Sequence, residues 1–230
     1  RFYHSNNPRD FLRGIKNLIT KDGFFVFEAP YWLNTIKSGK FDQIYHEHVT
    51  YLNIKSCYSM LNDYNLEIFD IAETEYHGGS IRIYSKFRKK PKLNQIVKNY
   101  IEQETKYGLF KLQTYSYFFS KLIKNKYTLL KKILEVKQKK YKVICVGAAA
   151  KGNTFLNFHG LDNNIIDYVT DLSKLKIGKY TPISNIPIVS DQIFKEYDKS
   201  YALILSWNIQ SILEKKIKKI NKRVKFLYYD

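Results

Sequence analysis

The sequence predicts an α/β protein with a parallel sheet in its second half. After Tyr141, short apolar runs typical of strands alternate with helical segments, and this alternation indicates a parallel sheet with helices on both faces. Earlier residues also mix helices and strands, and a charge-rich helical stretch separates the two parts. We therefore expect three segments, at 1–90, 91–140 and 141–230.

The first segment is predicted to start with a helix and a strand. Proline is favoured early in a helix, so Asn7-Pro8 marks its beginning, and apolar residues then recur at helical spacing up to Ile19. Asp22-Gly23 turns the chain into a short buried strand at 24–28. A second, amphipathic helix is expected at 54–64.

A β-hairpin is expected to follow this helix. The strands 66–71 and 81–84 flank a sharp turn that contains His77-Gly78-Gly79-Ser80. Two glycines after a histidine allow a ligand to approach the backbone closely. From the residues alone, an ordinary hairpin turn is the favoured interpretation.

The rest of the chain is predicted to be helical and then doubly wound. The stretch 91–140 has leucines and aromatic residues at a spacing that indicates one or two long helices. A basic amphipathic helix is expected at 209–222. Strands are expected at 142–146, 165–171, 186–189, 201–208 and 224–228.

Candidate ligand-binding residues follow the strands of the second sheet, where α/β proteins bind ligands. The loop 147–152 is not a Walker A sequence, because Lys151 precedes Gly152, and Ala149 replaces the middle glycine of the dinucleotide fingerprint. A helix N-terminus after such a small-residue loop, capped by Asn153-Thr154, favours an anion. A nucleotide or phosphate ligand and a Rossmann-like lobe without ligand both stay open.

The composition limits the classes of partner. The net charge of +18 is large, but the lysines are spread along helices and no nucleic-acid motif is present, so we expect no nucleic-acid partner. The sequence contains no run of about 18 apolar residues, so we expect no transmembrane helix. Two distant cysteines and the lack of a signal-peptide core favour a cytoplasmic protein. The sequence does not determine the oligomeric state.

The densest group of proton-carrying side chains is Tyr45-His46-Glu47-His48. Histidine titrates nearest neutral pH, and a neighbouring carboxylate or phenol can orient it. His46 and His48 would share a face on a strand, whereas Tyr45 and His48 would share one on a helix. A structural polar cluster stays open as an alternative. Metal binding is disfavoured, because zinc needs further ligands and the two cysteines are isolated.

Two separated motifs together resemble the sugar C-methyltransferases. The first is Phe41–His48 followed by His77–Ser80, and the second is Val146–Thr154 with Ser206–Asn208. The resemblance implies the C-terminal part of an S-adenosylmethionine (SAM)-methyltransferase Rossmann-like domain, a helical linker and a second Rossmann-like parallel-sheet domain. The family's cysteine-rich zinc domain and glycine-rich SAM loop are absent here, so we expect a fragment of a longer protein.

The resemblance also implies a reaction, the SAM-dependent C-methylation of a nucleotide-linked deoxy keto-sugar through an enolate. The expected partner is the nucleotide diphosphate keto-sugar. The SAM pocket would lie mostly outside this chain, and zinc would belong to the missing N-terminal domain, with none expected here. The alternative is a non-catalytic remnant or module that binds the nucleotide-sugar.

The resemblance assigns roles to individual residues. His48 or Tyr45 would abstract the proton, and a pKa near the working pH favours His48. Glu47 would orient the base, and His4 would lie near the enolate oxygen. The sugar pocket would be closed by His77, Gly78, Gly79 and Ser80.

The second lobe would hold the nucleotide diphosphate through Gly147, Lys151, Asn153, Asp171 and Asn208. Asp171 lies about 20 residues beyond the loop, where a ribose-binding acid is expected.

Overall fold

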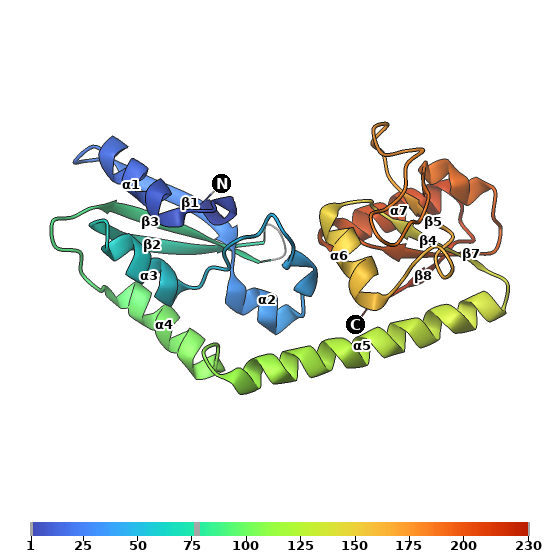
Figure 1. Cartoon of the computed structure of the whole chain (residues 1–230), viewed down its shortest axis with the longest axis horizontal. Coiled ribbons are helices and arrows are strands. Elements are labelled where there is room, and N and C mark those ends of the chain that lie inside the picture. The colour runs from blue at the N-terminus through green and yellow to red at the C-terminus, as the bar shows by residue number, and fades with distance from the viewer. Residues whose placement is uncertain (1, 76–78, 230) are drawn as a thin grey trace. The chain divides into compact units, whose positions relative to one another are not determined.

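The structure is a computed structural model that describes residues 2–75 and 79–229 (Figure 1). The chain divides into two compact units. The first unit comprises Arg1–Phe41 and His46–Phe118, and the second unit comprises Asp42–Tyr45 and Phe119–Asp230. The finer division at residues 90 and 140 stays a prediction.

The first unit is built on a three-stranded antiparallel sheet of order β1-β3-β2. The strands are β1 (Phe24–Pro30), β2 (Leu66–Thr74) and β3 (Ser80–Phe87). The expected hairpin is confirmed, because β2 and β3 pair along their whole length. His77 and Gly78, which precede β3 in the sequence, lie outside the described residues.

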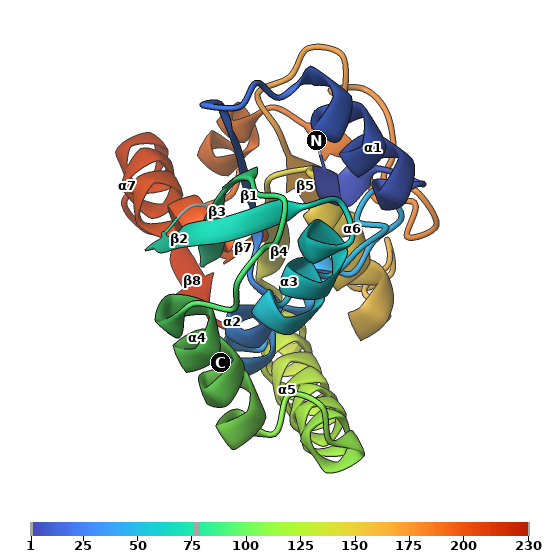
Figure 2. The same ribbon diagram turned by 90° about the vertical axis from the view of Figure 1, so that its left-hand side faces the viewer.

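Helices pack against this sheet, and asparagine side chains cap the starts of two of them. The Asn7 side chain accepts a hydrogen bond from the Asp10 N–H at the start of α1, and the Asn53 side chain accepts one from the Ser56 N–H at the start of α3. Leu12 of α1 and residues of α3 share one core with the strands. Figure 2 shows α1 and α3 together with the strands of this unit. The helices are η1 (Phe2–His4), α1 (Pro8–Leu18), α2 (Trp32–Ser38), η2 (Phe41–Gln43), α3 (Ile54–Asn62) and α4 (Gln95–Tyr107).

The segment that contains the central histidines is neither a helix nor a strand. Residues 44–53, here called the histidine loop, have no regular structure beyond an isolated bridge at Leu52. The strand and helix geometries considered for Tyr45, His46 and His48 are therefore wrong. The bridge joins Tyr31 to Leu52, and the Trp32 N–H donates to the Leu52 carbonyl at 3.0 Å. The segment from the end of β1 to the end of the histidine loop is here called the histidine excursion. These contacts join its two ends, so it starts and finishes at the same place.

A buried carboxylate joins both ends of this excursion. Glu104 of α4 is fully buried. It accepts hydrogen bonds from the Tyr31 hydroxyl at 2.9 Å, the Ile54 N–H at 2.5 Å and the Lys55 N–H at 3.2 Å. The last two are N-terminal amides of α3, which have no acceptor within the helix. Burial raises the pKa of Glu104, although these three donors favour the charged form.

The second unit contains a five-stranded, all-parallel sheet of order β6-β5-β4-β7-β8. This confirms the Rossmann-like α/β class predicted from the sequence. The strands are β4 (Lys142–Val146), β5 (Tyr168–Thr170), β6 (Ile188–Val189), β7 (Ser200–Ile204) and β8 (Lys225–Leu227). The helices are α5 (Leu112–Gln138), which begins in the first unit, α6 (Ala150–His159), η4 (Asp191–Lys195), η5 (Trp207–Ile209) and α7 (Gln210–Ile220). None of the helices in the described ranges is long and apolar enough to cross a bilayer.

The helix after β4 begins earlier than its sequence suggests. Asn153 does not cap α6, because the helix starts at Ala150 and the Asn153 N–H already bonds to the Ala149 carbonyl. Small residues make this early start possible. A Cβ on Gly152 would lie 3.0 Å from the Gly147 carbonyl oxygen, so the first turn fits directly against the end of the strand only with glycine there.

Replacing Glu104 with glutamine tests the closure of the histidine excursion. The amide oxygen can still accept from Tyr31 and Ile54, but the amide nitrogen faces another donor, the Lys55 N–H. We expect the free energy of unfolding to fall by about 1–2 kcal/mol in a urea titration. The control is Glu102→Gln, at an exposed position of the same helix, which should change stability by less than about 0.5 kcal/mol. Equal stabilities of the two variants would contradict the assigned role.

Candidate functional site

The first unit brings two predicted site residues together, His4 and His48. Their ring centroids lie 5.2 Å apart, and the ring planes are inclined by 42°. Tyr3 packs edge-on against both rings, with centroids 4.4 Å from His4 and 5.2 Å from His48. We call His4 and His48 the histidine pair. Two imidazoles this close can act on neighbouring atoms of one small ligand.

Backbone contacts hold the two segments of the histidine pair. The Thr50 N–H donates to the Tyr3 carbonyl at 3.3 Å, which ties the histidine loop to η1. Tyr3 and His48 are both buried, while His4 is partly exposed. The pair therefore has a fixed wall on the side of Tyr3. The sequence did not identify Tyr3, because an aromatic residue next to a histidine has no distinctive signature.

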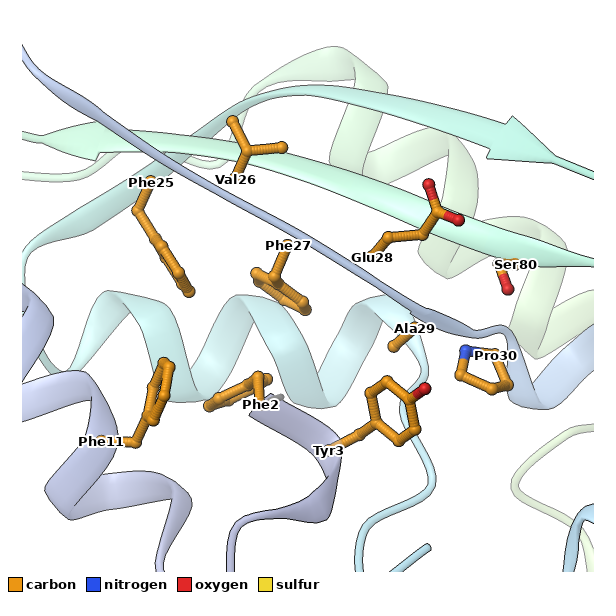
Figure 3. Close-up of a pocket in the computed structure, with 10 residues that line it drawn as sticks. All are labelled: Phe2, Tyr3, Phe11, Phe25, Val26, Phe27, Glu28, Ala29, Pro30 and Ser80. Carbon is orange, nitrogen blue, oxygen red and sulfur yellow. The ribbon is translucent and has the colours of Figure 1, made fainter. Parts of the chain in front are cut away.

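Tyr3 also lines a pocket of about 320 Å³. Figure 3 shows its aromatic side chains from β1 facing those from η1 and α1. Ser80, a predicted substrate-binding residue, is buried and contributes to the lining. Glu28 supplies the carboxylate of the lining, and it is paired with Arg82 at 2.8 Å. The pocket is thus mainly apolar. Its full lining is Phe2, Tyr3, Phe11, Phe25, Val26, Phe27, Glu28, Ala29, Pro30 and Ser80.

The other predicted residues of the histidine segment are placed differently. Glu47 and His46 are exposed at the turn of the loop. Tyr45 is partly buried and belongs to Asp42–Tyr45, which packs with the second unit. The roles of Tyr45 and Glu47 therefore stay predictions, and the histidine pair is the group that the first unit assembles by itself.

Of the predicted turn His77–Ser80, the structure describes only Gly79 and Ser80. Gly79 has a φ of +120°, and a Cβ there would lie 3.1 Å from the Asn34 Cβ, so the close approach of α2 favours glycine. The Gly79 carbonyl also accepts the Tyr31 N–H at 3.1 Å. Gly79 thus has a structural reason to be glycine, and its predicted part in binding sugar stays a prediction.

In the second unit, the loop after β4 presents a helix N-terminus at the carboxyl edge of the sheet. Gly147 has a φ of +101°, and a Cβ there would lie 2.6 Å from the Ser206 Oγ. Its N–H donates to the Thr170 carbonyl at 2.8 Å. Lys151 and Asn153 lie in the first turn of α6, which has no side-chain cap. The N–H groups of a helix N-terminus and a lysine beside them favour an anion.

Asp171 holds this loop from the neighbouring strand. Its carboxylate accepts the Ala148 N–H at 3.0 Å and the Ser173 N–H at 2.8 Å, and Lys176 lies 3.2 Å away. Burial alone would raise the pKa of Asp171, but these donors and the Lys176 charge lower it. Lys176 also donates to the Ala148 carbonyl at 2.7 Å. Asp171 therefore fixes the loop shape, which leaves its predicted contact with ribose a prediction.

An aromatic cluster follows β7 and β8 at the same edge. The Trp207 ring packs against Phe155 and Tyr229, with centroids 5.5 and 5.4 Å apart. Asn208, the next residue, is exposed. The His159 ring packs against Phe155 and Tyr229 of this cluster. Burial lowers the pKa of His159 to about 4, so it is neutral at pH 7. Within residues 2–75 and 79–229, no three His, Cys, Asp or Glu side chains are placed to hold a metal ion.

The chain is similar to C-methyltransferases over most of its length. The family model for the C-terminal domain of C-methyltransferases matches residues 75–229. The chain is also similar to the C-methyltransferase NovU of Streptomyces niveus, with 28% identity over 208 residues. The match covers 90% of this chain and 50% of that protein, so the chain spans about half the length of this relative. The resemblance inferred from the sequence motifs is confirmed, and the chain belongs to the C-methyltransferase family.

Proposed function

We propose that this chain supplies the acid–base groups and part of the nucleotide-sugar site of a SAM-dependent enzyme that methylates a carbon of a nucleotide-linked deoxy keto-sugar. The histidine pair is the observation that supports this most. Its rings lie 5.2 Å apart and both contact Tyr3, which also lines a mainly apolar pocket, in a protein of the C-methyltransferase family. SAM would supply the methyl group, and we assign none of the described residues to it.

The pair suits the first step of such a reaction. A ketone acidifies the neighbouring C–H, and a base must take that proton while a donor stabilises the enolate oxygen. The reacting carbon and the carbonyl oxygen are separated by a single carbon, so two imidazoles at 5.2 Å can face one atom each. In this proposal His48, the more buried ring, takes the proton, and His4 donates a hydrogen bond to the oxygen.

The second unit would hold the nucleotide diphosphate. The uncapped N-terminus of α6 and Lys151 can bind phosphate oxygens at the carboxyl edge of the parallel sheet. Trp207 and the exposed Asn208 lie after β7 and can contact the base or the sugar. Asp171 would act by holding the Ala148 amide and thus the loop.

Replacing His48 with asparagine in the intact enzyme tests the base. Asparagine keeps hydrogen bonding but cannot accept a proton at neutral pH, so kcat should fall by about 10²–10⁴-fold with a smaller change in KM. The matched control is His46→Asn, two residues away and exposed, which should keep kcat within about threefold. Near-normal turnover of the His48 variant would reject the assignment. If the His48 variant still binds nucleotide-sugar but has lost turnover, His48 acts in catalysis, and the alternative that the chain only binds nucleotide-sugar is excluded.

Replacing Lys151 with glutamine tests the nucleotide-diphosphate site. We expect Kd for uridine or thymidine diphosphate, measured by calorimetry, to rise about tenfold, because a charge-assisted contact worth about 1.5 kcal/mol is lost. The control is Lys174→Gln in an exposed loop of the same unit, which removes equal charge and should leave Kd within about twofold. If both variants bind equally well, phosphate is held elsewhere.

A further inference from the structure

The loop between β5 and β6 carries large apolar side chains that face water. It spans residues 171–187 and is here called the β5–β6 loop. Figure 1 shows it, in orange, projecting from the rest of the second unit. The exposed fractions are 72% for Leu172, 80% for Leu175, 61% for Tyr180 and 90% for Ile183. Single exposed apolar residues are ordinary, whereas several within one short loop mark an interaction surface.

Hydrogen bonds hold the loop in this shape. The Gly178 N–H donates to the Ile188 carbonyl at 2.9 Å, and the Thr181 N–H donates to the Ile186 carbonyl at 2.9 Å. The buried Thr181 hydroxyl also accepts the Ile186 N–H at 2.9 Å and bonds to the buried Ser184 hydroxyl at 2.7 Å. The loop therefore buries two polar side chains while it exposes apolar ones, the reverse of what water favours. Backbone groups that are bonded internally also lower the cost of leaving water.

Ile183, the most exposed of these side chains, has a strained backbone. Its φ is +65°, in the left-handed region that β-branched residues rarely adopt. Glycine or asparagine would fit there with less strain. The isoleucine thus lowers stability both through its backbone and through its exposure to water. Neither the fold nor the proposed reaction explains why an isoleucine stands there.

The loop is also positively charged. Residues 172–187 contain three lysines and no carboxylate. Lys176 pairs with Asp171 at 3.2 Å, whereas Lys174 and Lys179 are exposed. Apolar side chains among exposed lysines match the surface of an anionic bilayer, because the apolar groups can enter the headgroup region while the ammonium groups contact phosphates.

We propose that the β5–β6 loop docks the second unit on the surface of an anionic phospholipid bilayer. In this arrangement Leu175, Tyr180 and Ile183 enter the headgroup region, and Lys174 and Lys179 bind lipid phosphates. The net charge of +18 adds a long-range attraction to such a surface. The inference does not depend on the proposed function, since none of these five side chains is assigned to the nucleotide-sugar.

Other occupants fit these features less well. A nucleic acid is bound through arginines and stacked aromatic rings, but the loop has no arginine and a single aromatic residue, Tyr180. A second copy of the loop would bring lysines of the same charge together. Lys176 and Asp171 contact the loop before α6, so a bilayer and a nucleotide diphosphate would be bound by different side chains.

Sedimentation of this chain with vesicles tests the proposed surface. Binding to vesicles of equal parts phosphatidylglycerol and phosphatidylcholine should be at least about tenfold stronger than binding to phosphatidylcholine alone. The double variant Leu175→Gln/Ile183→Asn should lose about tenfold in binding to the anionic vesicles, because two inserted apolar side chains are removed. Its melting temperature should not fall by more than about 3 °C, since asparagine tolerates the left-handed backbone at position 183.

The matched control is Leu134→Gln/Ile212→Gln, which removes two exposed apolar side chains from α5 and α7. It should bind the anionic vesicles within about twofold of the unchanged chain. If the unchanged chain does not bind anionic vesicles, or if the two double variants bind them equally well, the proposal is wrong.

A fluorescent probe on the loop separates insertion from a purely electrostatic attraction. Cys57 and Cys145 are buried, so one new surface cysteine can be labelled selectively. An environment-sensitive label on Leu175→Cys should move its emission to shorter wavelength when anionic vesicles are added, whereas the same label on Ile212→Cys should not. Equal responses at both positions would show adsorption through net charge alone and would overturn the proposal. A change at Leu175→Cys that needs no vesicles and grows with protein concentration would replace the bilayer with a second copy of the chain.

Discussion

One buried carboxylate determines where the candidate base of this protein lies. The histidine loop has no helix or ladder of its own to order it, and ordering each backbone residue costs about 1–2 kcal/mol. Glu104 offsets part of this cost by binding Tyr31, before the excursion, and Ile54, directly after it. The Trp32–Leu52 hydrogen bond closes the same base. Because both ends are fixed, the loop can hold His48 against Tyr3 and His4.

The second unit uses carboxylates in the same way. Asp171 accepts the Ala148 N–H of the loop before α6, and Asp167 accepts the Val143 N–H at 2.8 Å while it pairs with two lysines. In both units a carboxylate satisfies backbone amides that the secondary structure leaves unpaired. These acidic residues of a lysine-rich chain therefore fix loops, and two of the loops carry predicted site residues.

The sequence predicted those features that depend on neighbouring residues. Asn7-Pro8 marked the start of the first helix, and the alternation of strands and helices indicated the parallel sheet, because these signals are local. Contacts between distant residues were not predictable. His4 meets His48 across 44 positions, and this pairing was available only through family resemblance. Glu104 looks like an ordinary polar position of a charged helix until α3 is placed beside it. The start of α6 was misjudged because close packing at Gly152, rather than a cap residue, determines it.

We propose that the histidine pair acts on the carbon beside a ketone. The most direct measurement is an experimental structure of the intact enzyme with its nucleotide-linked keto-sugar bound. We expect the His48 ring to lie within about 3.5 Å of the carbon next to the ketone, with the His4 ring at hydrogen-bond distance from the ketone oxygen. A bound sugar whose ketone lies away from both rings, with other side chains of the enzyme around the reacting carbon, would contradict it.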